Sequence, residues 1–248
     1  MIQKTYKTHM TYKTHQAVSL LLALLAIFLT GCNRQQMNIQ GISSLHELEG
    51  RMLYLRIYKD GDLATIDSSR IIHGKFQFTG PQRDTCLMAN LFIGDESLMP
   101  VVIDGSPLRI ILSENERKVE GSALNDTLFA FIRRKTALDR QLAELPRRES
   151  RMSLEGMDHD EILMQLNQEA AQLGAQEDNL VMGFIKANMD NVLGPGVFMI
   201  VTSSLPYPML NPRIEELITF ASPAFLNDPY VQEYIRMARE NEEAMHQE

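Results

Sequence analysis

Residues 51–62 read Arg51-Met52-Leu53-Tyr54-Leu55-Arg56-Ile57-Tyr58-Lys59-Asp60-Gly61-Asp62, and this stretch decides the fold of the first half of the chain. Apolar side chains recur at alternate positions up to Tyr58, which is the period of a strand with one buried face. The pair Asp60-Gly61 that follows is typical of a two-residue hairpin turn. Residues 63–66 are therefore expected to return beside the first strand.

The same alternation of short strands and turns continues as far as residue 121. The further expected strands are residues 71–72, 75–79, 87–93, 99–103, 108–112 and 118–121, separated by turns rich in glycine, aspartate and proline. Many short strands joined by such turns are typical of an antiparallel β-sandwich or an open barrel. The sequence thus predicts a β-rich domain over residues 38–121.

Residues 122–248 are predicted to form an all-helical domain, which makes the fold class α+β. Apolar side chains recur every three or four residues from Leu124 to Leu145, and again from Leu163 to Phe184. Lys135 interrupts the first stripe and Glu177 interrupts the second. Two matched stripes with a short connection indicate an antiparallel helical hairpin.

Proline and capping residues predict where these helices begin and end. Residues 146–150, which begin with a proline, are expected to break the first long helix. Asn211-Pro212 and Asp228-Pro229 each place a capping side chain before a proline, which predicts two further helices. The apolar run 197–201 is expected to be a short buried helix.

The acidic cluster Asp158-His159-Asp160-Glu161 allows two interpretations. Carboxylates and imidazole are good ligands for divalent metals. Acidic side chains are equally expected in the first turn of a helix, where they interact favourably with its dipole, and Asp158 with Glu161 forms a capping box. We favour the capping role and predict no metal site and no cofactor.

The N-terminus is typical of a targeting segment. The first 13 residues contain three lysines and no acidic residue, and residues 17–29 are apolar. That run is too short to span a bilayer, which needs about 20 residues, but it has the length of a signal-peptide core. Residues 5–10 and 11–16 nearly repeat, which we interpret as a harmless extension of the signal segment, and a start at Met10 instead of Met1 stays open.

The end of the apolar run, Leu29-Thr30-Gly31-Cys32, resembles the lipobox of bacterial lipoproteins. That resemblance implies a signal peptide at residues 1–31, cleavage before Cys32, lipid attachment to its sulfur, and a lipidated tether at residues 32–37. Asn33 replaces the aspartate that favours inner-membrane retention in such proteins. The resemblance therefore implies anchoring in the outer membrane, on its periplasmic face, although a surface-exposed location stays open.

The composition of the chain limits which partners and which cysteine chemistry are expected. The chain carries 24 basic and 32 acidic residues, a net charge of −8; without the three lysines of the signal segment the balance is 21 to 32, or −11. So acidic a chain is not expected to bind nucleic acid. Of its two cysteines, Cys32 is the expected lipid site, and Cys86 is expected to be an inert, buried residue at the start of a strand.

Five motifs follow one another in the β-rich half: Asn38-Ile39-Gln40-Gly41-Ile42, Ile66-Asp67-Ser68, Gly74-Lys75-Phe76-Gln77-Phe78-Thr79-Gly80, Ile103-Asp104-Gly105-Ser106-Pro107-Leu108 and Val119-Glu120-Gly121-Ser122. In this order the set resembles an uncharacterised lipoprotein domain of gut-anaerobe envelope proteins. In those proteins the domain precedes a thioredoxin-like domain of the alkyl-hydroperoxide-reductase type. Here no Cys-x-x-Cys pair follows, so the resemblance does not carry oxidoreductase activity to this chain.

No catalytic motif is present, neither a Gly-x-Ser-x-Gly elbow, nor HExxH, nor a glycine-rich nucleotide loop. We therefore expect a non-catalytic binding or scaffold lipoprotein, attached to the membrane through Cys32, whose partner is a protein, a glycan or a small molecule. One alternative is an accessory to envelope thiol–disulfide or peroxide chemistry that acts with a separate thioredoxin-like protein. Another is a hydrolase with a site that the sequence does not reveal.

Overall fold

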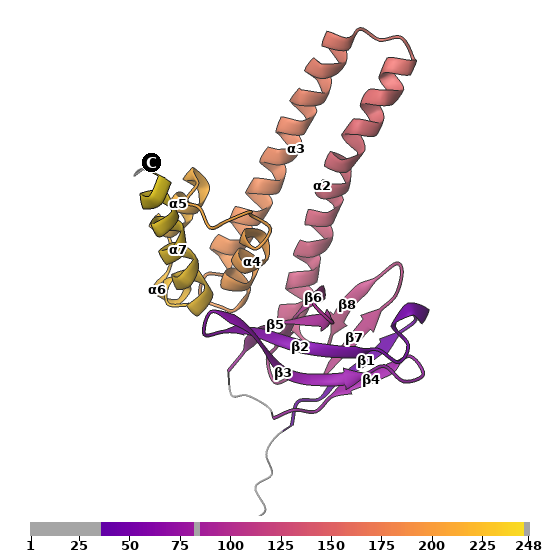
Figure 1. Ribbon diagram of the computed structural model, residues 1–248, viewed down its shortest axis with the longest axis vertical. Coiled ribbons are helices and arrows are strands. Elements are labelled where there is room, and N and C mark those ends of the chain that lie inside the picture. Colours follow the sequence, from indigo (N-terminus) through magenta and orange to yellow (C-terminus); the bar gives the residue numbers. More distant parts are fainter. Residues whose placement is uncertain (1–35, 82–84, 246–248) are drawn as a thin grey trace, which may run out of the picture. The chain divides into compact units, whose positions relative to one another are not determined.

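The computed structural model describes residues 36–81 and 85–245, so the expected signal peptide, Cys32 and Asn33 lie outside the described residues (Figure 1). Residues 37–248 form one compact unit. Strands occupy residues 39–120 and helices follow from residue 123, which confirms the predicted α+β class.

In the described part of the chain, eight strands form two four-stranded sheets. The strands are β1 (Ile39–Ser43), β2 (Met52–Lys59), β3 (Asp62–Arg70), β4 (Lys75–Phe78), β5 (Leu87–Ile93), β6 (Glu96–Ile103), β7 (Leu108–Leu112) and β8 (Arg117–Glu120). The orders are β4-β1-β7-β8 and β3-β2-β5-β6. All pairings are antiparallel except β1 with β7, which is parallel and departs from the purely antiparallel arrangement that we expected.

The hairpin between β2 and β3 forms where the sequence predicts it. Both turn residues have positive φ, 53° at Asp60 and 87° at Gly61. Those angles are required of both central residues in the turn type that matches the twist of a hairpin, and Asp-Gly supplies them at low cost. Alternate side chains of a strand share a face, and Leu53, Leu55 and Ile57 of β2 all face inward and are buried.

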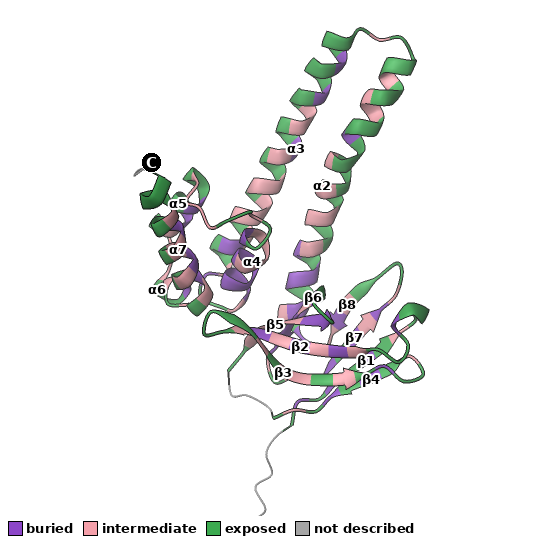
Figure 2. Ribbon diagram, in the orientation of Figure 1, coloured by how far each residue is buried: buried purple, intermediate pink, exposed green. Residues whose placement is uncertain are grey.

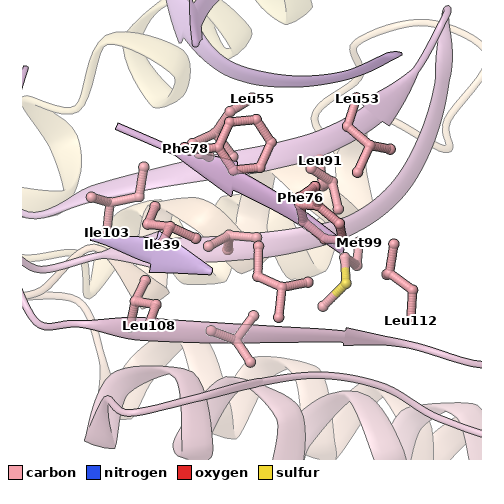
Figure 3. Packing of buried hydrophobic residues seen from close by; sticks show 14 of the residues in the cluster. Ile39, Leu53, Leu55, Phe76, Phe78, Leu91, Met99, Ile103, Leu108 and Leu112 are labelled. Atoms are coloured by element: carbon pink, nitrogen blue, oxygen red, sulfur yellow. The ribbon is translucent and has the colours of Figure 1, made fainter. Parts of the chain in front are cut away.

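The inward side chains of the two sheets form one apolar core (Figure 3). Ile39 and Phe78 enter it from one sheet, and Leu55 and Leu91 from the other, and each is at most 1% exposed. Phe129, from the long helix that follows the strands, joins the same cluster. The helical part therefore contributes to the sandwich core instead of only following it in the chain.

Two long helices, α2 (Ala123–Leu154) and α3 (His159–Ala187), form the predicted hairpin. The expected break at Pro146 is wrong, because α2 continues for eight residues beyond it. The apolar contacts continue past the proline: Leu145 packs with Ile162, Leu166 and Met152. An ion pair between Arg148 and Glu169, 2.5 Å apart, adds to this contact, so tertiary packing offsets the local cost of a helix proline.

The two charged residues that interrupt the apolar stripes meet each other. The Lys135 Nζ lies 2.7 Å from Glu177 Oε1 and 2.9 Å from Asp139 Oδ1. Partial burial lowers the pKa of Lys135, and the hydrogen bonds with the two carboxylates outweigh that effect and raise it. The predicted stripe of α3 is wrong at Leu163, which is 37% exposed, whereas its neighbour Ile162 is fully buried.

Four shorter helices complete the described chain: α4 (Leu193–Thr202), α5 (Pro212–Thr219), α6 (Pro223–Leu226) and α7 (Pro229–Met245). The predicted caps are confirmed. The side chain of Asn211 accepts from the N–H groups of Arg213 and Ile214, and Asp228 accepts from those of Tyr230 and Val231. Helix α6, which Ser222 caps, was not predicted.

The helices pack on the outer face of the β3-β2-β5-β6 sheet. Val102 of β6 and Met88 of β5 belong to the same apolar cluster as Phe198 of α4. Helix α4 approaches β5 so closely that a Cβ at Gly196 would collide with the Met88 side chain. Figure 2 shows buried residues concentrated in the sheets and short helices, whereas the far ends of α2 and α3 are largely exposed.

The first turn of α2 is joined to the edge strand β6 by a buried asparagine. Asn125 is 0% exposed; its Oδ1 accepts from Val102 N at 2.9 Å, and its Nδ2 donates to Val102 O at 2.8 Å. Further along the same strand, Arg117 Nη1 donates to Leu98 O at 3.1 Å, and Pro100 has no N–H to offer. Side chains thus cover the backbone of an edge that could otherwise pair with another strand.

Candidate functional site

Two hollows flank the base of α2. The first, which we call the sheet hollow, has a volume of about 460 Å³ and lies between the outer face of the β3-β2-β5-β6 sheet and the helices. Its lining includes Tyr58, Asn90, Phe92, Ser97 and Pro100 from the sheet, and Ile132, Lys135, Met199, Ser203 and Tyr230 from the helices. It is therefore built by residues from both halves of the chain.

Two tyrosines meet at one end of the sheet hollow. The rings of Tyr58 and Tyr230 lie edge to face, with centroids 5.0 Å apart. The Tyr230 hydroxyl lies 2.9 Å from Thr202 Oγ1, within hydrogen-bond distance. Desolvation raises the pKa of both phenols, and the Glu233 carboxylate raises that of Tyr58 further. Both hydroxyls therefore stay protonated at neutral pH. Because the Thr202 hydroxyl donates to Phe198 O at 2.7 Å, the Tyr230 hydroxyl donates to Thr202 Oγ1.

An arginine stacked between aromatic rings lies beside this hollow on the sheet surface. The Arg56 guanidinium carbon is 4.8 Å from the centroid of Phe92 and 5.3 Å from that of Tyr54. Such cation–π contacts fix a long side chain in place. The ring of Phe92, which lines the hollow, is thus covered by the Arg56 guanidinium.

The second hollow, which we call the edge hollow, has a volume of about 830 Å³ and adjoins the first along a neighbouring face of α2. Its lining consists of Leu98, Met99 and Pro100 of β6, residues 113–118, which connect β7 to β8 and begin β8, and Phe129, Ile132, Arg133, Thr136, Ala137 and Arg140 of α2. The two hollows share a common wall, made by Leu98, Met99 and Pro100 of β6 and by Ile132 and Thr136 of α2. A partner that engages the base of α2 could therefore contact both.

Cys86 contradicts our prediction of a buried core residue. It is exposed, because β5 begins one residue later, at Leu87. Its thiol is nevertheless a weak nucleophile at neutral pH. Partial desolvation of the sulfur, and then the nearby Asp104 carboxylate, raise the pKa of the Cys86 thiol.

We therefore expect Cys86 to react with a thiol reagent in the native protein, without denaturation. In a Cys32→Ala variant, where Cys86 is the one remaining thiol, the alkylation rate should increase with pH. Its midpoint should lie above the value of about 8.5 for a free cysteine, because only the thiolate reacts. Stopped-flow alkylation between pH 6 and 11 measures this. A midpoint below that of a cysteine peptide would contradict the raised pKa.

The acidic cluster at Asp158 has the capping role that we favoured. Asp158 Oδ1 accepts from the N–H groups of Asp160 and Glu161, at 3.0 and 3.3 Å. Within residues 36–81 and 85–245, no three His, Cys, Asp or Glu side chains are grouped so that they could hold a metal ion. Across the same residues, no helix is long and apolar enough to cross a bilayer.

One feature of the sequence indicates the position of the sheet hollow, although our predictions from the sequence do not use it. The outward positions of β2 carry Tyr54, Arg56 and Tyr58, which is unusually aromatic and cationic for a solvent-facing strand side. Those side chains are half-buried because helices or neighbouring aromatic rings cover them. The partner Tyr230 lies far away in the chain, and no local pattern could have paired it with Tyr58.

Comparison with known families identifies the β-rich half. Residues 37–128 match the model of a domain of unknown function, DUF4369. No curated protein and no solved structure shows a significant match. The matched range contains all eight described strands and the first turn of α2, including Asn125. Residues 37–128 thus form a DUF4369 domain, and α2 begins inside it.

Proposed function

We propose that this protein is a lipid-anchored binding module of the bacterial envelope, which recognises a partner protein at the base of its helical hairpin. The anchor is a lipid on Cys32 in the periplasmic face of the outer membrane. The observation that carries the binding role is the sheet hollow, a preformed recess that both halves of the chain line.

The chemistry of the sheet hollow suits recognition of a protein surface. Aromatic and methionine side chains supply contact area, and tyrosine is enriched among residues that dominate binding energy. Tyr58, Phe92 and Met199 provide that area here, and the protonated phenol of Tyr58 adds a hydrogen-bond donor. Because Tyr230 is already fixed by Thr202, little conformational entropy would be lost on binding.

A role as accessory to thiol–disulfide chemistry is less well supported. The exposure of Cys86 makes its thiol accessible, but an attacking thiol needs thiolate character near neutral pH. Desolvation and Asp104 shift the pKa of Cys86 in the opposite direction. A binding function therefore explains the exposed surface of the protein better than thiol–disulfide chemistry at Cys86 does.

The lipid anchor predicts that Cys32 is acylated in cells. Labelled palmitate should enter the wild-type protein and should be absent from Cys32→Ala, because one acylated residue is the expected attachment point. A Cys86→Ala variant is the matched control and should be labelled as strongly as the wild type. Equal labelling of Cys32→Ala and wild type would refute the anchor and the envelope location that depends on it.

Filling the sheet hollow tests the binding role. Ser97 is exposed and lines the hollow, so Ser97→Trp should place an indole in the recess and exclude a partner. We expect proteins that co-purify with the wild-type lipoprotein after mild crosslinking to be lost from this variant, with its melting temperature unchanged. Ser153→Trp, near the far end of α2, is the matched control. Retention of every partner by Ser97→Trp would contradict the proposed function.

A further inference from the structure

The edge hollow carries a second binding feature, which is a set of arginines. Arg133 and Arg140 are exposed and lie seven residues apart, so they lie on one face of α2 about 10.5 Å apart along its axis. Across the described chain, neither guanidinium has a hydrogen-bond or ion-pair partner. Arg117 lies on the opposite wall, where Nη1 donates to Leu98 O and its other N–H groups stay available.

The other charges of this hollow leave it basic. Lys118 lies 3.3 Å from Glu116 and 3.0 Å from Glu120, so one ammonium faces two carboxylates and these three groups carry a net charge of −1. Glu114 is the remaining acidic residue of the lining, against three arginines, so these seven groups together carry a net charge of +1. A positive recess on a chain with a net charge of −8 favours an anionic ligand.

The floor of the edge hollow is apolar. Met99 and Phe129 are almost fully buried there, and Leu98, Pro100 and Ile132 are half-buried around them. A ligand made only of anionic groups would leave this floor uncovered, and a flat bilayer surface would not reach it. The occupant therefore needs apolar side chains as well as negative charge.

The backbone of β6 does not offer a strand for pairing at this hollow. Asn125 occupies both polar groups of Val102, and Arg117 occupies the carbonyl of Leu98. Pro100, between them, has no N–H group. Recognition must therefore depend on side chains, with arginines pairing to carboxylates, which is a strong and directional interaction.

We propose that the edge hollow binds an extended acidic peptide segment of a partner protein. Carboxylates of the segment pair with Arg133 and Arg140, and its apolar side chains rest on Leu98 and Pro100. An extended chain advances by about 3.3 Å per residue and turns alternate side chains to the same face. Acidic residues two or four positions apart, about 6.6 or about 13.2 Å, therefore face one wall and lie within reach of two long arginine side chains about 10.5 Å apart. The proposal rests on the proposed binding function and gives the chemistry of the partner.

Fluorescence anisotropy with a labelled peptide tests the proposal. The probe is a ten-residue peptide that alternates aspartate with leucine or valine, titrated with the full-length protein in detergent micelles. The double variant R133Q/R140Q should weaken binding by at least about tenfold, because two charge-assisted contacts are lost. The matched control R134Q/R151Q removes two other exposed arginines of α2 and should bind like the wild type.

Two further probes separate the proposal from unspecific charge attraction. A peptide with serine in place of its apolar residues, and inorganic polyphosphate, should both bind at least about tenfold more weakly than the probe. The proposal would be overturned if the serine peptide or polyphosphate bound as tightly as the probe. It would also be overturned if R133Q/R140Q and R134Q/R151Q weakened binding of the probe equally. No binding of the probe to the wild type would also overturn it, but it would leave the sheet hollow intact as long as Ser97→Trp still loses its partner.

Discussion

Replacing Asn125 with alanine is expected to lower the free energy of unfolding by about 3 kcal/mol, because the change leaves two buried backbone groups unpaired. Asn125 is fully buried and makes both of its hydrogen bonds with Val102. For a unit of this size such a loss corresponds to a fall in melting temperature of about 6–12 °C. Chemical denaturation followed by circular dichroism measures the free energy of unfolding, and thermal denaturation measures the melting temperature.

The control for this prediction is Asn179→Ala, which changes an exposed asparagine in the middle of α3. Surface substitutions of this kind alter stability by no more than about 0.5 kcal/mol. If Asn125→Ala changed stability as little as Asn179→Ala, the hydrogen bonds to Val102 would not be what holds α2 to the sheet edge.

Replacing Phe198 with alanine is expected to cost about 3–5 kcal/mol, the usual cost of truncating a buried aromatic side chain. Phe198 is 1% exposed, and its ring centroid lies 5.1 Å from that of Tyr234 and 5.5 Å from that of Phe225. Its loss should open a cavity between α4, α6 and α7. The same denaturation experiment measures the effect.

Phe220→Ala is the matched control, since Phe220 is 68% exposed and contacts Lys186 in a cation–π arrangement at the surface. We expect this change to cost less than about 1 kcal/mol. A cost for Phe198→Ala no larger than that of Phe220→Ala would show that the short helices do not pack around Phe198.

The elements of the fold could be predicted because their signals are local. Alternation of apolar residues places β2, β5 and β7 within a residue or two, and Asp60-Gly61 places their first turn. Asn211 and Asp228 cap the helices that they were expected to cap. The break predicted at Pro146 is wrong because a local signal is overridden there by tertiary contacts. Residues of α3, distant in the chain, pack against α2 and keep it helical past the proline.

The hollows could not be predicted because their residues meet only through tertiary structure. Tyr58 and Tyr230 are 172 positions apart, and they come together only when α7 packs beside β2. The pairing of Lys135 with Glu177 has the same character, although each residue was visible as a gap in its stripe. Cys86 was placed wrongly because the strand that contains its apolar neighbours begins one residue later.

The central claim is that a partner is recognised at the base of the helical hairpin, and site-specific photocrosslinking in intact cells tests it most directly. A photoreactive amino acid would replace Ser97 or Thr136 at the base, and Ser153 or Gln165 toward the far ends of α2 and α3. The account predicts a discrete crosslinked protein at both base positions and none at the far positions. Crosslinks at the far positions alone, or equally at all four, would contradict it.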